Sequence, residues 1–101
     1  MSLKKQYNEK KTACKVTFKV PKNIAASAIK INLAGDFNGW NIENLPMKKS
    51  KTGDFSITVN LDAGREYQFR YIIDGKHWIN EPDADKHLLN EFHTENSIII
   101  V

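Results

Sequence analysis

The chain has 101 residues, the usual size of one folded domain. Hydrophobic residues make up 41% of it and charged residues 27%, and five Phe, three Tyr and two Trp add large apolar area, so a fully disordered chain is excluded. No apolar run is longer than residues 98–101. We therefore expect no membrane-spanning helix, no secretory signal and a cytoplasmic location.

The formal net charge is +3, from 15 Lys and Arg against 12 Asp and Glu. Seven of the lysines gather in two groups, Lys4, Lys5, Lys10 and Lys11 near the start, and Lys48, Lys49 and Lys51 farther along. A basic leader and one basic loop are typical of solubilising surface rather than of a groove that follows phosphates. The sequence therefore favours neither a nucleic acid nor a membrane as partner.

Residues 1–11 are polar and aperiodic, which predicts a flexible leader before a single domain at residues 12–101. Apolar and polar residues then alternate with period two, the pattern of half-buried strands. Strands are predicted at 14–20, 29–33, 55–61, 66–73, 76–79 and 97–101. Residues 62–64 are predicted to close a hairpin, and residues 84–95 to form a loop or one helical turn.

No segment sustains helical spacing beyond about two turns. Short strands separated by regular turn signals predict an all-β fold, an antiparallel immunoglobulin-like β-sandwich of about seven short strands. The single cysteine, Cys14, has no disulfide partner, so we expect it to be a small buried apolar residue.

The residues that could carry catalysis show no catalytic pattern. Four acids lie in turn-like contexts where a carboxylate caps backbone N–H groups, and three histidines lack the spacing of metal ligands: Asp36, Asp74, Glu81 and Asp83, and His77, His87 and His93. The sequence also has no phosphate-binding glycine loop and no nucleophile elbow. We therefore expect no enzymatic activity, no metal and no cofactor.

Aromatic residues in turns are the most informative feature of the sequence. Trp40 follows an Asn-Gly pair, Trp78 follows an Asp-Gly pair, and Phe92 lies in a polar loop. Turns lie at the surface, so these rings are candidates for ligand contact. Flat rings on a rigid β scaffold suit either nucleobases or the C–H faces of sugar rings.

Four motifs occur in one order and together resemble a known family: Leu33 to Trp40 (LAGDFNGW), Tyr67 to Gly75 (YQFRYIIDG), Trp78 with Glu81-Pro82, and Asn96 to Ile98. The sequence resembles the glycogen-binding module family, the early-set domains of isoamylases, branching enzymes and the β subunit of AMP-activated protein kinase. The resemblance covers about residues 12–101. It implies a non-catalytic sandwich that binds α-1,4-linked glucans such as glycogen, starch and maltooligosaccharides.

The resemblance also implies site residues at matching positions. Trp40 and Trp78 take the places of the stacking tryptophans, and Arg70 that of the basic hydrogen-bonding residue. The last loop contributes Phe92 as a bulky apolar side chain, Thr94 as a hydroxyl and Asn96 as an amide. An aromatic plane, fixed guanidinium donors and an amide that both donates and accepts are together complementary to glucose rings.

A second interpretation stays open, in which the domain docks a glucan-metabolising enzyme or kinase through a sheet face without binding sugar itself. A separate glucan-active enzyme is also left open as a partner of a sugar-binding module.

One structural expectation follows from requiring Trp78 to share a sheet face with Arg70. A two-residue turn at Asp74-Gly75 would pair Tyr71 with Trp78 and point the indole inward. A three-residue loop, residues 74–76, instead pairs Ile72 with Trp78 and brings the indole to the face that carries Arg70.

Overall fold

The computed structural model describes residues 2–25, 27–90 and 94–101. Over these residues the chain forms short strands joined by loops, with one turn of α-helix and one of 3-10 helix. The elements are β1 Ser2–Tyr7, β2 Ala13–Val20, α1 Lys22–Ala25, β3 Ile31–Gly35, η1 Asp36–Asn38, β4 Lys48–Lys49, β5 Phe55–Asp62, β6 Glu66–Ile73, β7 His77–Ile79, β8 Lys86–Leu89 and β9 Glu95–Ile100. None of the helices in this part of the chain has the length and apolar character that crossing a membrane requires.

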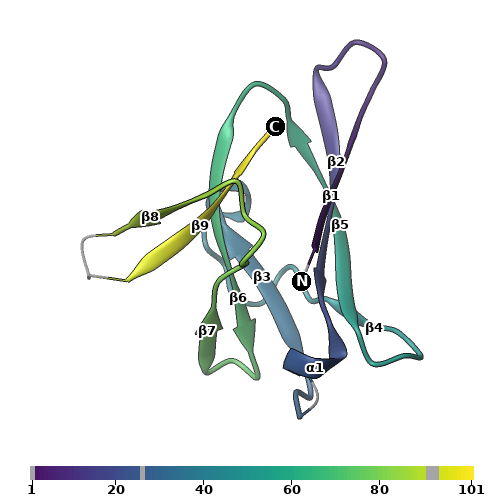
Figure 1. Cartoon of the computed structure of the whole chain (residues 1–101), viewed down its shortest axis with the longest axis vertical. Helices are drawn as coiled ribbons and strands as arrows, with labels where there is room; N and C mark the ends of the chain where they lie inside the picture. Colours follow the sequence, from purple (N-terminus) through teal and green to yellow (C-terminus); the bar gives the residue numbers. More distant parts are fainter. Residues whose placement is uncertain (1, 26, 91–93) are drawn as a thin grey trace.

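The strands form two antiparallel sheets that pack face to face. The first sheet has the order β1-β2-β5-β4, and the second has the order β3-β6-β9-β8 with β7 paired to β6. Figure 1 shows β2 and β5 in one layer and β3, β6 and β9 in the other. The predicted all-β sandwich is confirmed, with nine strands in the described residues instead of about seven.

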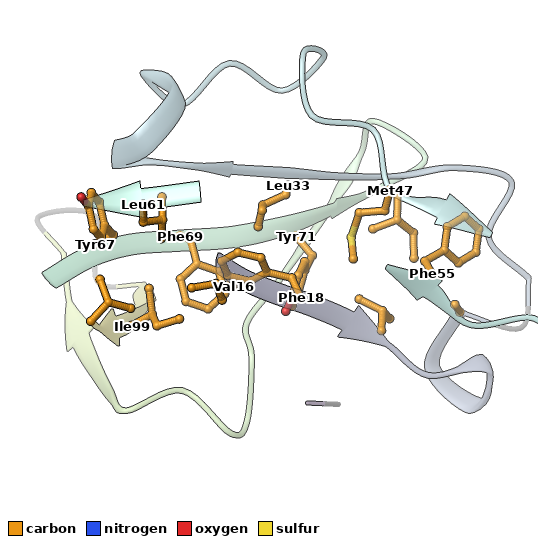
Figure 2. Close-up of a cluster of buried hydrophobic side chains, with 14 of the residues drawn as sticks. Val16, Phe18, Leu33, Met47, Phe55, Leu61, Tyr67, Phe69, Tyr71 and Ile99 are labelled. Carbon is orange, nitrogen blue, oxygen red and sulfur yellow. The ribbon is translucent and has the colours of Figure 1, made fainter. Parts of the chain in front are cut away.

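The core lies between the sheets and follows from the period-two alternation. In β2, Cys14, Val16, Phe18 and Val20 are buried, while Lys15 and Lys19 are exposed. Figure 2 shows the buried side chains of the two sheets in one cluster. The Phe69 and Phe18 ring centroids are 5.1 Å apart. Cys14 is fully buried, as expected.

The hairpin predicted at residues 62–64 is wrong, because β5 and β6 belong to different sheets. β5 pairs with β2 over its whole length, and β6 pairs with β3 and β9. The connection is an arch between the layers, fixed by a hydrogen bond from the Tyr67 hydroxyl to the Asp62 carbonyl (3.0 Å) and one from the Gly64 N–H to the Val101 carbonyl (2.8 Å). The same short turn sequence occurs in hairpins and in such arches, so it does not show which of the two connects the strands.

The structure adds three edge strands that the pattern did not predict, of which the two-residue β4 pairs with β5. Residues 2–7, expected to be a flexible leader, form β1 against β2, and residues 86–89, expected to be loop or helical turn, form β8 against β9. All four residues of β8 are exposed, and β1 is mostly polar. A strand that buries few side chains has no alternation to read, because its pairing rests on backbone hydrogen bonds. The domain boundary at residue 12 stays a prediction.

Phe69→Ala should lower the free energy of unfolding by about 3–5 kcal/mol, because Phe69 is fully buried and contacts both Phe18 and Tyr71. Urea denaturation followed by circular dichroism measures this loss. Ile29→Ala is the matched control, since the Ile29 side chain is 87% exposed, and it should change stability by less than about 0.5 kcal/mol. If the two substitutions lowered the free energy of unfolding equally, Phe69 would not belong to the core.

Candidate functional site

The β6–β7 hairpin has the three-residue loop that the sequence predicted. Ile73 pairs with His77 and Ile72 with Trp78, and the Lys76 N–H donates to the Ile73 carbonyl at 3.0 Å. Asp74 and Gly75 both adopt positive φ, at 53° and 70°. Because of this register the Trp78 indole lies on the outer face of the sheet, where it is 43% exposed.

The Asp74 carboxylate fastens this hairpin to the segment that precedes β3. Its Oδ1 atom accepts hydrogen bonds from the backbone N–H groups of Ile29 (2.8 Å) and Lys30 (2.9 Å). Hydrogen bonds from Lys30 and then Ile29 lower the pKa of the Asp74 carboxyl below its ordinary value. The turn that carries Trp78 is therefore anchored by a charged acceptor.

Trp40 is held by a second carboxylate, that of Asp36. The indole N–H of Trp40 donates to Asp36 Oδ1 at 3.0 Å, and the Gln68 backbone N–H donates to Asp36 Oδ2 at 2.8 Å. Trp40 itself adopts φ 60°, a strained conformation for a bulky residue. The approach to η1 passes so close to β6 that a Cβ on Gly35 would lie 2.5 Å from the Gln68 carbonyl oxygen, which only glycine avoids.

These anchors bring the two indoles together on the outer face of the second sheet. The Trp40 and Trp78 ring centroids are 6.5 Å apart and the ring planes are inclined by 32°. The Arg70 guanidinium carbon lies 5.8 Å from the Trp78 ring centroid, within the range of a cation–π contact. The three side chains therefore form one surface that combines aromatic planes with fixed hydrogen-bond donors.

Polar contacts fix the floor beside the indoles. Arg70 donates from Nε and Nη2 to the Glu95 carbonyl at 3.0 and 2.9 Å, and Asn80 Nδ2 donates to the same oxygen at 2.8 Å. Asn96 Nδ2 donates to Gln68 Oε1 at 2.9 Å. Because a guanidinium has five N–H donors, Arg70 keeps donors for a ligand after these two bonds.

A buried polar network continues from this floor into the core. Ser97 Oγ donates to Asn80 Oδ1 (2.9 Å) and accepts from the Glu81 backbone N–H (2.8 Å), and the Tyr71 hydroxyl donates to Glu81 Oε1 at 2.7 Å. Burial raises the pKa of the Glu81 carboxyl and that of the Tyr71 hydroxyl. Asn80, which donates to the same Glu95 carbonyl as Arg70, is thus hydrogen bonded to the fully buried Ser97.

The indoles line an open groove of about 720 Å³, together with Asp36, Gln68, Arg70, Asn90, Thr94 and Asn96. Five predicted site residues meet here: Trp40, Arg70, Trp78, Thr94 and Asn96. Phe92, the sixth, lies outside the described residues, as does His93.

Sequence reasoning missed three residues of the groove, Asp36, Gln68 and Asn90. Gln68 could have been predicted as a site residue, because it alternates with Arg70 along β6 and therefore shares its outward face. Asn90 closes its loop on Thr94, whose N–H donates to Asn90 Oδ1 at 3.2 Å. The contact of Asp36 with β6 spans 32 residues and has no local signal.

Three of the four acids interpreted as caps accept backbone N–H groups, Glu81 locally from Asp83, and Asp36 and Asp74 from distant segments. Within residues 2–25, 27–90 and 94–101, no group of three or more His, Cys, Asp or Glu side chains is placed to hold a metal ion. The lining of the groove offers aromatic planes and hydrogen-bonding groups to a ligand.

A sandwich with an aromatic groove on one sheet face is the architecture of a carbohydrate-binding module. Residues 9–101 match the family described as the glycogen recognition site of AMP-activated protein kinase. The chain belongs to this family. A comparison with curated proteins gives no match.

Asp74→Asn should destabilise the protein at neutral pH and progressively less in acid. The amide keeps an oxygen acceptor and tolerates positive φ, but it lacks the charge. Since the pKa of Asp74 is lowered in the folded protein, its carboxylate stabilises above the unfolded pKa of about 3.9, and this contribution is lost as pH falls through the folded pKa.

Urea unfolding of both proteins from neutral pH to about pH 2.5 measures the difference. Asp62→Asn, at the exposed end of β5, controls for removing a charge alone. A difference that stays constant with pH would contradict the anchoring role of the Asp74 charge.

Proposed function

We propose that the chain binds α-1,4-linked glucans such as glycogen, starch and maltooligosaccharides without modifying them. The observation that carries this proposal is the pair of inclined indoles, 6.5 Å apart, beside Arg70 in an open groove. Trp40 and Trp78 would stack on glucose rings, and Arg70, Thr94 and Asn96 would bind hydroxyl groups. Phe92, from the same loop as Thr94, would add an apolar contact.

The chemistry of the groove supports a sugar ligand. A pyranose ring has a C–H face that packs on an aromatic plane and a rim of hydroxyls that need both donors and acceptors. The two ring planes are inclined to each other by 32°, and both rings line the groove. Two rings that are not coplanar suit an α-1,4-linked chain, whose successive glucose units turn relative to one another, better than they suit a flat, extended polymer.

The acid content of the groove supports binding without hydrolysis. Glycoside hydrolysis ordinarily uses two carboxyl groups on either side of the scissile bond. Among the described residues that line the groove, Asp36 is the one acid, and both of its oxygens accept hydrogen bonds from the protein. Membership of a carbohydrate-binding family is itself typical of a non-catalytic domain.

Isothermal titration with maltoheptaose should give a Kd on the order of 10 μM to 1 mM. An open groove buries little ligand area, and the hydroxyls must lose water before they bind. Absence of heat up to millimolar ligand, with folded protein, would reject sugar binding and favour docking of a glucan-metabolising enzyme or kinase on this face. Oligonucleotide binding that weakens steeply with salt would favour a nucleic-acid ligand.

Trp40→Ala and Trp78→Ala should each abolish measurable maltoheptaose binding while the protein stays folded, because each removes one of the two aromatic planes. Tyr7→Ala is the control, since Tyr7 is an exposed aromatic residue of β1, in the other sheet, and should bind as the wild type does. Titration of the three variants measures the loss of binding, and thermal unfolding measures any loss of stability. A tryptophan variant as unstable as Phe69→Ala would assign that indole to the core.

A further inference from the structure

A second hollow adjoins the aromatic groove on the same sheet face. It measures about 210 Å³, and its lining includes Asp36, Glu66, Gln68, Lys86 and Leu88. Asp36 and Gln68 also line the aromatic groove, so the two depressions share a wall. None of the remaining residues of this hollow belongs to the site inferred above.

The register of the strands places the two depressions one after the other along β6. Arg70, Gln68 and Glu66 are alternate residues of β6 and share its outer face, about 7 Å apart from one to the next. Across the sheet, Gln68 pairs with Ile98 and Ile98 with Lys86, while Asn96 pairs with Leu88. A ligand chain that leaves the indoles past Gln68 therefore reaches β8.

The second hollow has the chemistry that a sugar ring requires. Leu88 is 48% exposed on this face, an apolar side chain available to a C–H surface. Lys86 Nζ and Glu66 Oε1 form an ion pair at 2.7 Å with both side chains about half exposed, which offers donors and acceptors to hydroxyls. Sites for drug-sized ligands are larger, about 300–1,000 Å³, so this hollow suits a single ring.

We propose that the sugar site extends across Gln68 onto β8, where Leu88, Lys86 and Glu66 hold one additional α-linked glucose unit beyond those on the indoles. This inference rests on the proposed glucan binding. It gives the module a preference for longer or branched chains over short ones, and the additional unit comes either from the same linear chain or from an α-1,6 branch.

The test compares two leucines of the same edge strand that point to opposite faces. Leu88→Ala and Leu89→Ala remove the same atoms, and Leu89 is 60% exposed on the other side of β8. Maltotriose, maltoheptaose and an α-1,6-branched maltooligosaccharide are titrated into both variants and the wild type. Leu88→Ala should bind maltotriose as the wild type does and should bind the preferred longer ligand about three- to tenfold more weakly.

Leu89→Ala should match the wild type with all three ligands, and Lys86→Ala should repeat the loss seen in Leu88→Ala. A loss confined to the branched ligand assigns the additional unit to a branch, and an equal loss with maltoheptaose assigns it to the linear chain. Unchanged binding of both long ligands by Leu88→Ala and Lys86→Ala overturns the extension while leaving the indole site intact.

Failure of the wild type to bind any of the three ligands would instead reject the proposed function, and the extension with it. Sedimentation velocity adds an independent outcome. If the wild type forms a dimer that Leu88→Ala abolishes, Leu88 serves self-association through the β8 edge, and the inference is wrong.

Discussion

The two-sided alternation of β6 is the constraint on which the rest of the structure depends. Its inward residues Tyr67, Phe69 and Tyr71 are buried between the sheets, and the outward residues between them, Gln68 and Arg70, form the floor of the groove. β6 also pairs with β3, β7 and β9, so it positions every strand that contributes to the site. A slip of one residue would exchange the two faces, exposing the aromatic core and burying Arg70. Core and site therefore depend on a single register.

Local chemistry explains what the sequence could predict. Alternation identified the inward residues of β2 and β6, and the requirement that Trp78 share a sheet face with Arg70 predicted the length of the β6–β7 loop. Pairing between distant segments has no such signal. The arch between β5 and β6, the three edge strands β1, β4 and β8, and the bond of Asp36 to β6 all rest on contacts that tertiary packing decides. The two tryptophans and Arg70 were thus easier to predict than Asp36, whose carboxylate orients Trp40.

Among the described residues, two of the three non-glycine residues with positive φ lie where the indoles are presented. Trp40 and Asp74 both have positive φ, a conformation that costs non-glycine residues on the order of 1–3 kcal/mol each. Each is compensated by hydrogen bonds to a carboxylate that reaches a distant strand or loop, Asp36 for Trp40 and the side chain of Asp74 itself for the β6–β7 turn. The strain is a consequence of turning an aromatic ring outward from a tight loop. The two acids act as structural anchors of the aromatic surface.

The buried Glu81 extends this anchoring into the core. A carboxyl group without solvent contact is costly unless it is hydrogen bonded, and Glu81 accepts from the Tyr71 hydroxyl at 2.7 Å and from the Asp83 backbone N–H at 3.1 Å. Through Ser97 and Asn80, the same network reaches the Glu95 carbonyl that holds Arg70. An apolar residue at position 81 would leave the Tyr71 hydroxyl and the Asp83 backbone N–H without their acceptor, while the bond from the residue 81 backbone N–H to Ser97 would remain. Rigid support beneath an open groove reduces the conformational entropy that a ligand must remove on binding, which matters most where little area is buried. In the proposed sugar site, selectivity would come from the fixed positions of the rings and donors.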